Sequence, residues 1–462
     1  MRAQGYRSGL KGEVTAYLSL VFLLLVSFTG SMMESASIQN AKNYGRADMN
    51  RAMESVFAEY QKELLEDYDI FALEGSYETG NYSETLLKKR LAYYGAGSMK
   101  QKVQAIEFLT DQGGRAFYRQ AAAYMEHKYG LSAFRGQEGD ATIWRQQEQE
   151  AKKVQEQERE QQQELSDLLE QEEGALPEKD NPIAHVDKLK SSPLLDLVTP
   201  KEMTVSQKAI RLEETASHRS LQKGYGEFTQ GEEETGALSD VLFGEYLMDH
   251  FSGATEGKDT GALDYELEYL LAGEGSDREN LEAVAGKLLL LRFVPNYVHL
   301  QSSAGKKAEA RALAGTLCTL LAVPAITEAA AQAILLAWAF GESVMDLRAL
   351  LKGSKVPLVK TEENWQLSLA NLMKLGGEED PGDGKDGKTG LDYRAYLRIL
   401  LLLESKEDLS IRALDLIEAN MKAEHGLTFF RADQCISRLE MESTCSLRRG
   451  VTYRFPTYFA YQ

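Results

Sequence analysis

The longest uncharged segment of the chain lies near its N-terminus. It covers the 20 residues from Val14 to Met33, and Glu13 and Glu34 flank it. A helix of this length extends about 30 Å, which matches the hydrocarbon core of a bilayer. The pattern predicts a transmembrane helix, so the membrane is the first expected partner of the chain, contacted through this segment.

Charges around this segment predict its orientation. Arg2, Arg7 and Lys11 precede it, whereas the first basic residue after it is Lys42. The positive-inside rule predicts a single-pass protein of the cell membrane, with residues 1–13 in the cytoplasm and the body outside. A cleaved signal peptide has similar flanks, but its apolar part spans only about 7–15 residues. The length favours a retained anchor; cleavage near the small residues 35–37 is the alternative.

A helical pattern continues beyond the apolar segment. Apolar residues recur there at steps of three, four or eight positions: Ile38, Ala41, Met49, Ala52, Val56, Tyr60 and Leu64. This spacing predicts one helix over about residues 14–66, whose second part packs on the outer domain. The alternative is two helices with a break near residues 31–37.

The next blocks are shorter and more polar. Periodicity predicts helices over residues 83–94, 97–109 and 114–129. Residues 141–173 are mostly Gln, Glu, Lys and Arg, which predicts a solvated, partly frayed helix. Residues 174–236 contain four prolines within 24 positions and are expected to be an extended linker, with a short helix around 205–216.

The apolar body is expected over residues 237–428. Within it, residues 316–341 are long enough to cross a bilayer, but Glu328, Gln332 and Pro324 interrupt the run. A charged residue near the centre of a span costs about 2.5–3.5 kcal/mol. We therefore expect two buried helices of a soluble bundle here.

Two segments of the body resemble each other: GKDTGALDYELEYLL, which ends at Leu271, and GKDGKTGLDYRAYLRILLLL, which ends at Leu403. In both, a Gly/Asp loop leads through Leu-Asp-Tyr into a helix. Asp264 and Asp392 are expected to cap the two helices, because a carboxylate accepts the free N–H groups there. Internal duplication and capping chemistry both explain the similarity.

The C-terminus changes to a period of two. Residues 435–447 and 451–461 alternate around Arg448-Arg449-Gly450, which predicts a β-hairpin packed on a helix. Pro456 indicates that the last strand is an edge strand. A straight strand would separate Cys435 from Cys445 by roughly 33 Å, too far for a disulfide. We expect free thiols; a chain reversal near residues 442–443 would permit a bond.

Composition narrows the class of protein. The 462 residues include 52 Lys and Arg against 71 Asp and Glu, a net charge of −19. A nucleic-acid-binding surface needs a basic stripe, so no nucleic-acid partner is expected. Three cysteines are too few for a four-cysteine zinc site.

These patterns predict a mainly α (α+β) fold: a long N-terminal transmembrane helix, a helical extracytoplasmic body and a small C-terminal β-hairpin. The expected divisions are residues 1–13 (cytoplasmic segment), 14–33 (transmembrane helix), 34–135 (stalk and first helices), 136–173 (polar helix), 174–236 (linker), 237–428 (helical body) and 429–462 (β-hairpin).

Candidate chemistry is sparse. The sequence has no His-Glu-x-x-His, Gly-x-Ser-x-Gly, P-loop or dinucleotide-binding pattern. We therefore predict no catalytic, cofactor-binding or metal-binding residue. The six histidines are expected at the surface or in packing: His127, His185, His218, His250, His299 and His425.

Two further clusters are weighed on spacing. Asp380, Asp383 and Asp386 lie three apart, which does not fit an EF-hand, so a mobile loop is expected. Trp338 and Trp365 are expected in the core, with an exposed peptide-binding groove as the alternative.

Several segments resemble an uncharacterised family of single-pass Gram-positive envelope proteins. They are KGEVT (11–15), ESA (34–36), SVFAEY (55–60), YDIF (68–71), LDYE (263–266), EYLL (268–271), WA (338–339), ES (342–343), DL (346–347) and KVPL (355–358). The resemblance covers most of the chain and is weakest over residues 137–236. It implies a domain of unknown function without an established activity.

The N-terminus is also similar to the minor pseudopilins of tight-adherence pilus systems. Those proteins carry a Gly before the cleavage point and a Glu five residues later. Here Gly12 is followed at that spacing by Tyr17, so the sequence does not predict processing after Gly12.

Two functions of different classes follow. The first is a non-enzymatic, membrane-anchored structural or assembly protein, associated with a pilus-like or secretion apparatus through protein partners in the envelope. The alternative is a surface-displayed binding module that recognises a protein or an envelope polymer. The missing catalytic motifs and the order of a long helix first and a hairpin last favour the first.

Overall fold

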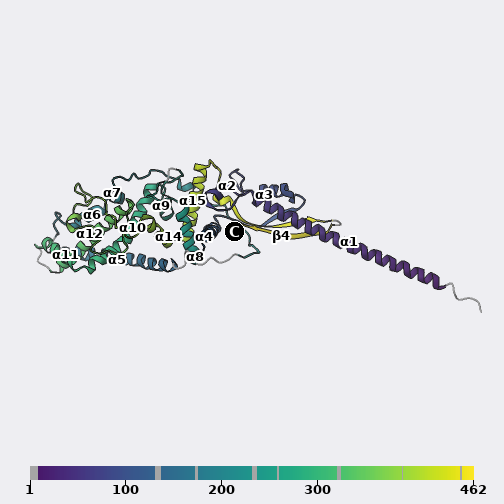
Figure 1. Cartoon of the computed structure of the whole chain (residues 1–462), viewed down its shortest axis with the longest axis horizontal. Coiled ribbons are helices and arrows are strands. Elements are labelled where there is room, and N and C mark those ends of the chain that lie inside the picture. Colours follow the sequence, from purple (N-terminus) through teal and green to yellow (C-terminus); the bar gives the residue numbers. More distant parts are fainter. Residues whose placement is uncertain are drawn as a thin grey trace, which may run out of the picture.

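A computed structural model describes residues 9–130, 137–171, 175–231, 237–257, 260–319, 324–387, 389–447 and 450–461. The molecule is elongated: α1 projects from one end and a helical body forms the other (Figure 1). Arg2 and Arg7 of the predicted cytoplasmic segment, and Arg448 and Arg449 of the predicted turn, lie outside the described residues.

The fold is mainly helical with one small antiparallel sheet, as the sequence predicts. The helices are α1 (Gly9–Phe57), α2 (Lys62–Tyr68), α3 (Glu84–Leu91), α4 (Asp111–Tyr129), α5 (Gln137–Gln171), α6 (Pro182–Lys190), α7 (Leu194–Val198), α8 (Ala237–His250), α9 (Glu266–Ala272), α10 (Asp277–Ser302), α11 (Ala304–Leu317), α12 (Pro324–Leu351), α13 (Leu369–Leu372), α14 (Tyr393–Leu403) and α15 (Lys406–Glu424). Shorter helical turns are η1 (Ala92–Ala96), η3 (Leu212–Glu214) and η4 (Ala432–Gln434). The strands are β1 (Leu73–Glu74), β2 (Lys100–Phe108), β3 (Cys435–Ser446) and β4 (Thr452–Ala460).

Helix α1 is continuous through the apolar segment and beyond it. The expected continuity is therefore confirmed, and the alternative break near residues 31–37 is wrong. The helix ends at Phe57 rather than near residue 66, and α2 starts separately at Lys62. Among the described residues, α1 is the one helix that is long and apolar enough to cross a membrane, and its apolar window is 0% buried. Length and composition alone do not distinguish a membrane span from a signal sequence.

The second half of α1 packs on the sheet. Met49, Met53 and Val56 are buried in a cluster with Leu439 and Phe455 of β3 and β4. At the end of the helix, Phe57 stacks on Phe459 with ring centroids 4.2 Å apart, and the hydroxyl of Tyr461 donates to the carbonyl oxygen of Phe57. This apolar contact fixes the direction in which α1 leaves the body.

Strand β3 is the centre of the sheet. It pairs antiparallel with β2 along one side and with β4 and the short β1 along the other. The predicted hairpin and edge strand are confirmed: β4 is an edge, and Pro456 lies opposite Glu442. Strand β3 is unbroken between Cys435 and Cys445, and both thiols are free, as expected.

One predicted helix is wrong. Residues 97–109 contain strand β2, which pairs from Lys100, opposite Thr444, to Phe108, opposite Ile436. The local pattern suits either element, and pairing with β3 decides it, because strand preference reflects the tertiary surroundings more than the residues alone.

The body is built around α12. Helices α10, α11, α5 and α6 all pack on it. The predicted interruption at Pro324 is confirmed, but the prediction of two helices within residues 316–341 is wrong: α12 begins at Pro324 and covers the rest of the range, and α11 contributes only its end at Leu317. Glu328 stays at the surface, where it pairs with Arg311 at 2.9 Å.

The predicted extended linker is partly wrong. Residues 174–236 contain α6 and α7, which bury Val186 and Val198 against the body. Pro182 and Pro193 lie at the helix starts, where a missing N–H costs nothing, so the prolines begin these helices rather than break them. The short helix expected around residues 205–216 is reduced to η3.

Two other expectations need correction. Helix α5 is mostly exposed but not merely solvated, because Ala151 and Leu165 are buried against the body.

Asp392 caps α14 by accepting from the amide of Ala395 at 2.9 Å, as predicted. Asp264 does not cap α9; it pairs with Lys208 at 2.7 Å instead.

Candidate functional site: a cavity beneath a strap

The segment between α7 and α8 crosses from the body to the sheet in extended form. We call residues 204–229 the strap. It forms single β-bridges at Ala209, opposite Ser276, and at Tyr225, opposite Ile106. The strap therefore touches both the body and the sheet.

Carboxylates of the body and sheet hold the strap at intervals. Each accepts a hydrogen bond from a strap amide or hydroxyl: Asp277 from the hydroxyl of Ser206 (2.6 Å), Asp415 from the amide of Ser217 (3.0 Å), Asp433 from the amide of Gln222 (2.8 Å), Asp111 from the amide of Gly224 (3.0 Å) and Glu440 from the amide of Thr229 (2.8 Å). A segment without regular structure must satisfy its amides through side chains or water, and these acids satisfy several of them.

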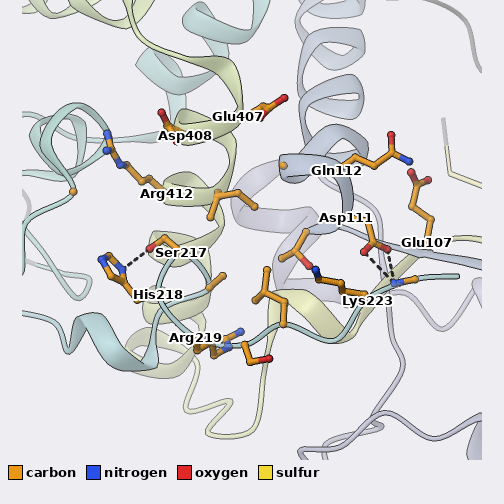
Figure 2. A pocket seen from close by; sticks show the side chains of 18 of the residues that line it. Glu107, Asp111, Gln112, Ser217, His218, Arg219, Lys223, Glu407, Asp408 and Arg412 are labelled. Carbon is orange, nitrogen blue, oxygen red and sulfur yellow. Dashed lines mark hydrogen bonds between the residues drawn. The ribbon is translucent and has the colours of Figure 1, made fainter.

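A cavity of about 1240 Å³ lies beside the strap. Its walls are the start of α4, strap residues 216–228, the loop after α9 and the first turns of α15. Figure 2 shows Glu407, Asp408 and Arg412 of α15 on one side and Asp111 on the other. Acidic and basic groups both line the cavity, so its walls do not favour a ligand of one charge.

The strap passes close to the start of α4 and the end of β2. Asp111 receives the amide of Phe108 at 2.7 Å as well as that of Gly224. Burial raises the pKa of the Asp111 carboxyl, although these two amides act against the rise. A Cβ at Gly224 would lie 2.2 Å from the carbonyl oxygen of Ile106, so only glycine fits at this point of the strap.

Arg219 is the strap's main ionic contact. Its guanidinium binds Glu418 through two hydrogen bonds of 2.8 and 2.7 Å and reaches Asp433 at 2.8 Å. Burial acts to raise the pKa of Asp433, but hydrogen bonds from Arg431, Gln222 and Arg219 outweigh it and hold the pKa below its usual value. This geometry anchors the strap and leaves Arg219 little capacity for a ligand.

Ser217, His218 and Asp415 form the group closest to a catalytic constellation. The Ser217 hydroxyl donates to Asp415 at 2.5 Å and lies 2.9 Å from Nδ1 of His218 (Figure 2 shows the latter bond). In a nucleophilic triad the histidine stands between the serine and the carboxylate. Here the serine stands between the other two, so the carboxylate holds the hydroxyl instead of orienting the imidazole.

A second polar cluster lies sealed inside the body. Lys360 binds Glu342 at 2.6 Å and Asp346 at 2.7 Å, and Asp346 also binds Arg292 at 3.0 Å. All four side chains are 1% exposed or less. We call these four residues the buried ionic network. Burial raises the pKa of the Glu342 carboxyl, while the ammonium of Lys360 opposes that rise.

Of the two tryptophans expected in the core, Trp338 is buried there and Trp365 is half-buried against it. Trp338 is 1% exposed and donates to the carbonyl oxygen of Leu367 at 2.7 Å, which confirms its expected place. The ammonium of Lys306 lies 4.9 Å from the ring centroid of Trp338 and 4.6 Å from that of Trp365. These contacts occupy the ring faces on which the alternative peptide groove depended.

Two of the histidines lie against carboxylates. His250 and His425 contact Asp69 and Asp67, at 3.1 and 2.6 Å. Asp67, Glu424 and His425 are the one group in the described part of the chain that could supply three metal ligands, and all three are exposed.

The acidic loop is held by its neighbours. Asp380 receives two hydrogen bonds from Arg348, and Asp383 pairs with Lys352 at 2.9 Å. The loop expected to be mobile therefore has two acids with basic partners on α12 and at the end of that helix.

Sequence reasoning did not single out the strap or its carboxylates. The acids come from α4, α10, α15, β3 and the turn before β3, so no local spacing joins them. The closest signal was the pair Gly224 and Gly226 within a polar segment, where a Cβ would strike the backbone of β2 in both cases.

Comparison with known families gives one result. A family of unknown function (DUF5702) matches residues 172–447, more than half of the chain. The chain belongs to this family. The DUF5702 region contains the strap, the body apart from α5, and β3, but not α1, β2, α4, α5 or β4. No curated protein and no solved structure matches the chain.

The DUF5702 region includes only one of the described strands of the sheet. Its last strand, β3, pairs with β1, β2 and β4, all of which lie outside the match. The buried ionic network lies wholly inside it. The match therefore supports the expected uncharacterised domain, and it carries no activity with it.

Proposed function

We propose that this protein is a non-enzymatic, membrane-anchored structural or assembly protein with its body outside the cytoplasm. One observation carries the proposal: α1 leaves its apolar half unburied and uses its other half to hold the C-terminal sheet. A helix that is fixed to a folded body at one end and bare at the other suits a protein that places its body at a set distance from a membrane.

The packing of α1 on the sheet favours an assembly role over that of a flexible membrane tether. Because α1 packs on β3 and β4 up to its last turn, the anchor and the sheet form one unit. The order of a long N-terminal helix and a C-terminal hairpin resembles the plan of minor pseudopilins, which supports association with a pilus-like or secretion apparatus. Protein partners in the envelope would then contact the anchor helix itself.

The hydrogen bonding around the cavity supports the non-enzymatic part of the proposal. Ser217, Asp415, Arg219 and Asp111 use their polar atoms to hold the strap. A nucleophile needs an adjacent base that is itself oriented for proton transfer, and the described cavity residues lack that arrangement.

A surface-displayed binding module is the second candidate. The cavity of about 1240 Å³ favours it, since it is large enough for a short peptide or a segment of an envelope polymer. Its mixed charge gives no preference between these two ligand classes.

Photocrosslinking distinguishes the two functions. A benzophenone amino acid replaces Leu24, which is 62% exposed on α1, or Gln112 at the cavity, in full-length protein in native membranes. The assembly role predicts protein adducts from position 24. Adducts from position 112 alone would support the binding module and contradict assembly through the anchor.

Topology is tested in the same cells. Protease added to intact, wall-stripped cells should digest the body and leave a short fragment that contains residues 14–33. A protected body would contradict the proposed orientation, and release of the whole chain into the medium would contradict a retained anchor.

A further inference from the structure

Five basic side chains gather at one end of the sheet. They are Lys42 and Arg46 on α1, Lys100 and Lys102 on β2, and Arg454 on β4. The register places Lys100 and Arg454 on either side of Thr444, so these side chains share one face of the sheet. The Lys42 and Arg46 head groups lie 5.0 and 5.3 Å from the ring centroid of Tyr453, over the other face. We call these five residues the basic collar.

The collar has little acidic compensation. None of its five members forms an ion pair with any residue that the structure describes. Two acids lie on that face of the sheet: Glu442, opposite Lys102, and Glu440, which accepts a hydrogen bond from the amide of Thr229. Asp48 on α1 pairs with Arg51 at 2.8 Å. In a chain with a net charge of −19, this end of the sheet carries the opposite sign.

The collar lies at the membrane end of the sheet. Phe57 contacts Phe459, which pairs with Leu439, whereas Gly45 faces the sulfur of Cys445. Strand β3 therefore runs along α1 toward its apolar half (Figure 1). The end of β3 and the start of β2 and β4 point in the direction in which α1 would enter a bilayer.

The distance suits a headgroup contact. Lys42 follows Met33 by nine residues, which is about 13 Å along a helix. The headgroup layer adds roughly 5–7 Å beyond the hydrocarbon core, and the electrostatic screening length is about 8–10 Å. The collar is therefore within reach of charged headgroups, and the sheet residues beyond Cys445 extend closer still.

We propose that the basic collar binds anionic phospholipid headgroups of the leaflet that α1 enters. This inference rests on the proposed membrane anchoring and adds a second contact to it. A basic residue near an anionic surface strengthens attachment by roughly fivefold. A second contact, several residues away from the span, would fix the tilt of the body relative to the membrane instead of letting it swing about α1.

Depth measurements in nanodiscs test this contact. Full-length protein with Thr452→Cys, labelled with a fluorophore, is inserted into discs of neutral phosphatidylcholine or of phosphatidylcholine with phosphatidylglycerol. Thr452 is exposed beside the collar, and the native cysteines are buried. Quenching by a headgroup-linked nitroxide should be roughly twofold stronger in the anionic discs, and high salt should abolish the difference.

Charge reversal supplies the control. Lys100→Glu, Lys102→Glu and Arg454→Glu together should remove the difference between the two discs. Lys179→Glu, Lys188→Glu and Lys201→Glu change the net charge equally at exposed positions of the body and should leave the difference intact.

The outcomes separate the two proposals. A chain that fails to insert into either disc contradicts membrane anchoring. If the chain inserts but its quenching is the same in both discs, lipid binding by the collar is contradicted while membrane anchoring stands. Binding of the collar to an acidic protein or polymer, with no dependence on the lipid, would also contradict the collar proposal.

Discussion

The core of the body and the core between α1 and the sheet are built on different principles. Around α12, charged groups are enclosed: Lys360 and Glu342 are 0% exposed and bind each other at 2.6 Å. Around α1, the buried cluster consists of apolar side chains such as Met53, Val56 and Phe455. The body core therefore adds directional partners to its apolar packing, whereas the α1 core depends on shape and volume.

This difference predicts opposite responses to substitution. A buried charge whose partner is removed retains its desolvation penalty, so even a side chain of similar shape is destabilising. An apolar core tolerates a swap that conserves volume but not a cavity. A Lys→Met substitution in the body core and a Met→Leu substitution in the α1 core both conserve side-chain shape. We therefore expect the largest difference in lost unfolding free energy between these two substitutions.

The largest effect is expected at the buried ionic network. Lys360→Met leaves Glu342 and Asp346 without their shared ammonium and should cost about 3–5 kcal/mol of unfolding free energy. Denaturant unfolding measures this loss. Lys352→Met, which breaks an exposed pair with Asp383, is the control and should have little effect. Equal losses for the two variants would contradict the role of burial.

The apolar core should respond to volume alone. Met53→Ala opens a cavity beneath the sheet and should cost about 3 kcal/mol, whereas Met53→Leu should cost less than about 1.5 kcal/mol. Met53 is 1% exposed, so the lost contacts are not replaced by water. A large loss for Met53→Leu would mean that the α1 core is as specific as the ionic network, and the contrast would fail.

Glu268 gives the body core a pH dependence that the apolar core lacks. It is fully buried and accepts hydrogen bonds from the Tyr393 hydroxyl (2.7 Å) and the Ala254 amide (3.0 Å). Burial raises the pKa of this carboxyl from 4.5 to about 7. Between these values the folded chain holds a proton that the unfolded chain releases, so this contribution to stability is full below pH 4.5 and is lost as the pH rises through 7.

The measurement is the free energy of unfolding against pH. The slope due to Glu268 should approach about −1.4 kcal/mol per pH unit within that window. Glu268→Gln should flatten the curve, while Glu274→Gln at an exposed position should not. An unchanged slope in Glu268→Gln would show that the carboxyl ionises alike in both states.

Sequence periodicity predicted the elements whose tertiary contacts agree with their local preference. The continuous α1, the division before α12 and the C-terminal hairpin follow from periodicity and from Pro324. Strand β2 did not, because its partner β3 is more than 300 residues away in the chain. Helices α6 and α7 were missed because proline was taken as a helix breaker, although at a first turn it is a helix starter.

No local sequence pattern predicted the candidate site. Asp111, Asp415 and Asp433 are ordinary acids of a strongly acidic chain, and only the fold brings them to one strap. By contrast, the sequence segments WA, ES and DL of α12 were noticed by resemblance, and they lie in the buried core. Their charged members, Glu342 and Asp346, are enclosed with Lys360 and therefore form no accessible site.

The smallest effect is expected where the two regions meet. Ser217→Ala removes a 2.5 Å hydrogen bond to Asp415 but keeps the amide bond to the same carboxylate and the 2.9 Å bond from Tyr269. The loss should be about 1 kcal/mol. Burial raises the pKa of Asp415 and the Ser217 hydroxyl opposes that rise, so the loss should shrink at acid pH, where the carboxyl is protonated.

Amide hydrogen exchange locates the consequence. In Ser217→Ala, exchange should accelerate within residues 206–229, while amides of α1 and β3 remain as slow as before. Ser220→Ala, another exposed serine beside the cavity, should change neither. Faster exchange throughout α1 and β3 would mean that loss of a single strap contact has loosened the apolar core as well. The strap would then couple the two cores, and they would form one cooperative unit with two kinds of packing.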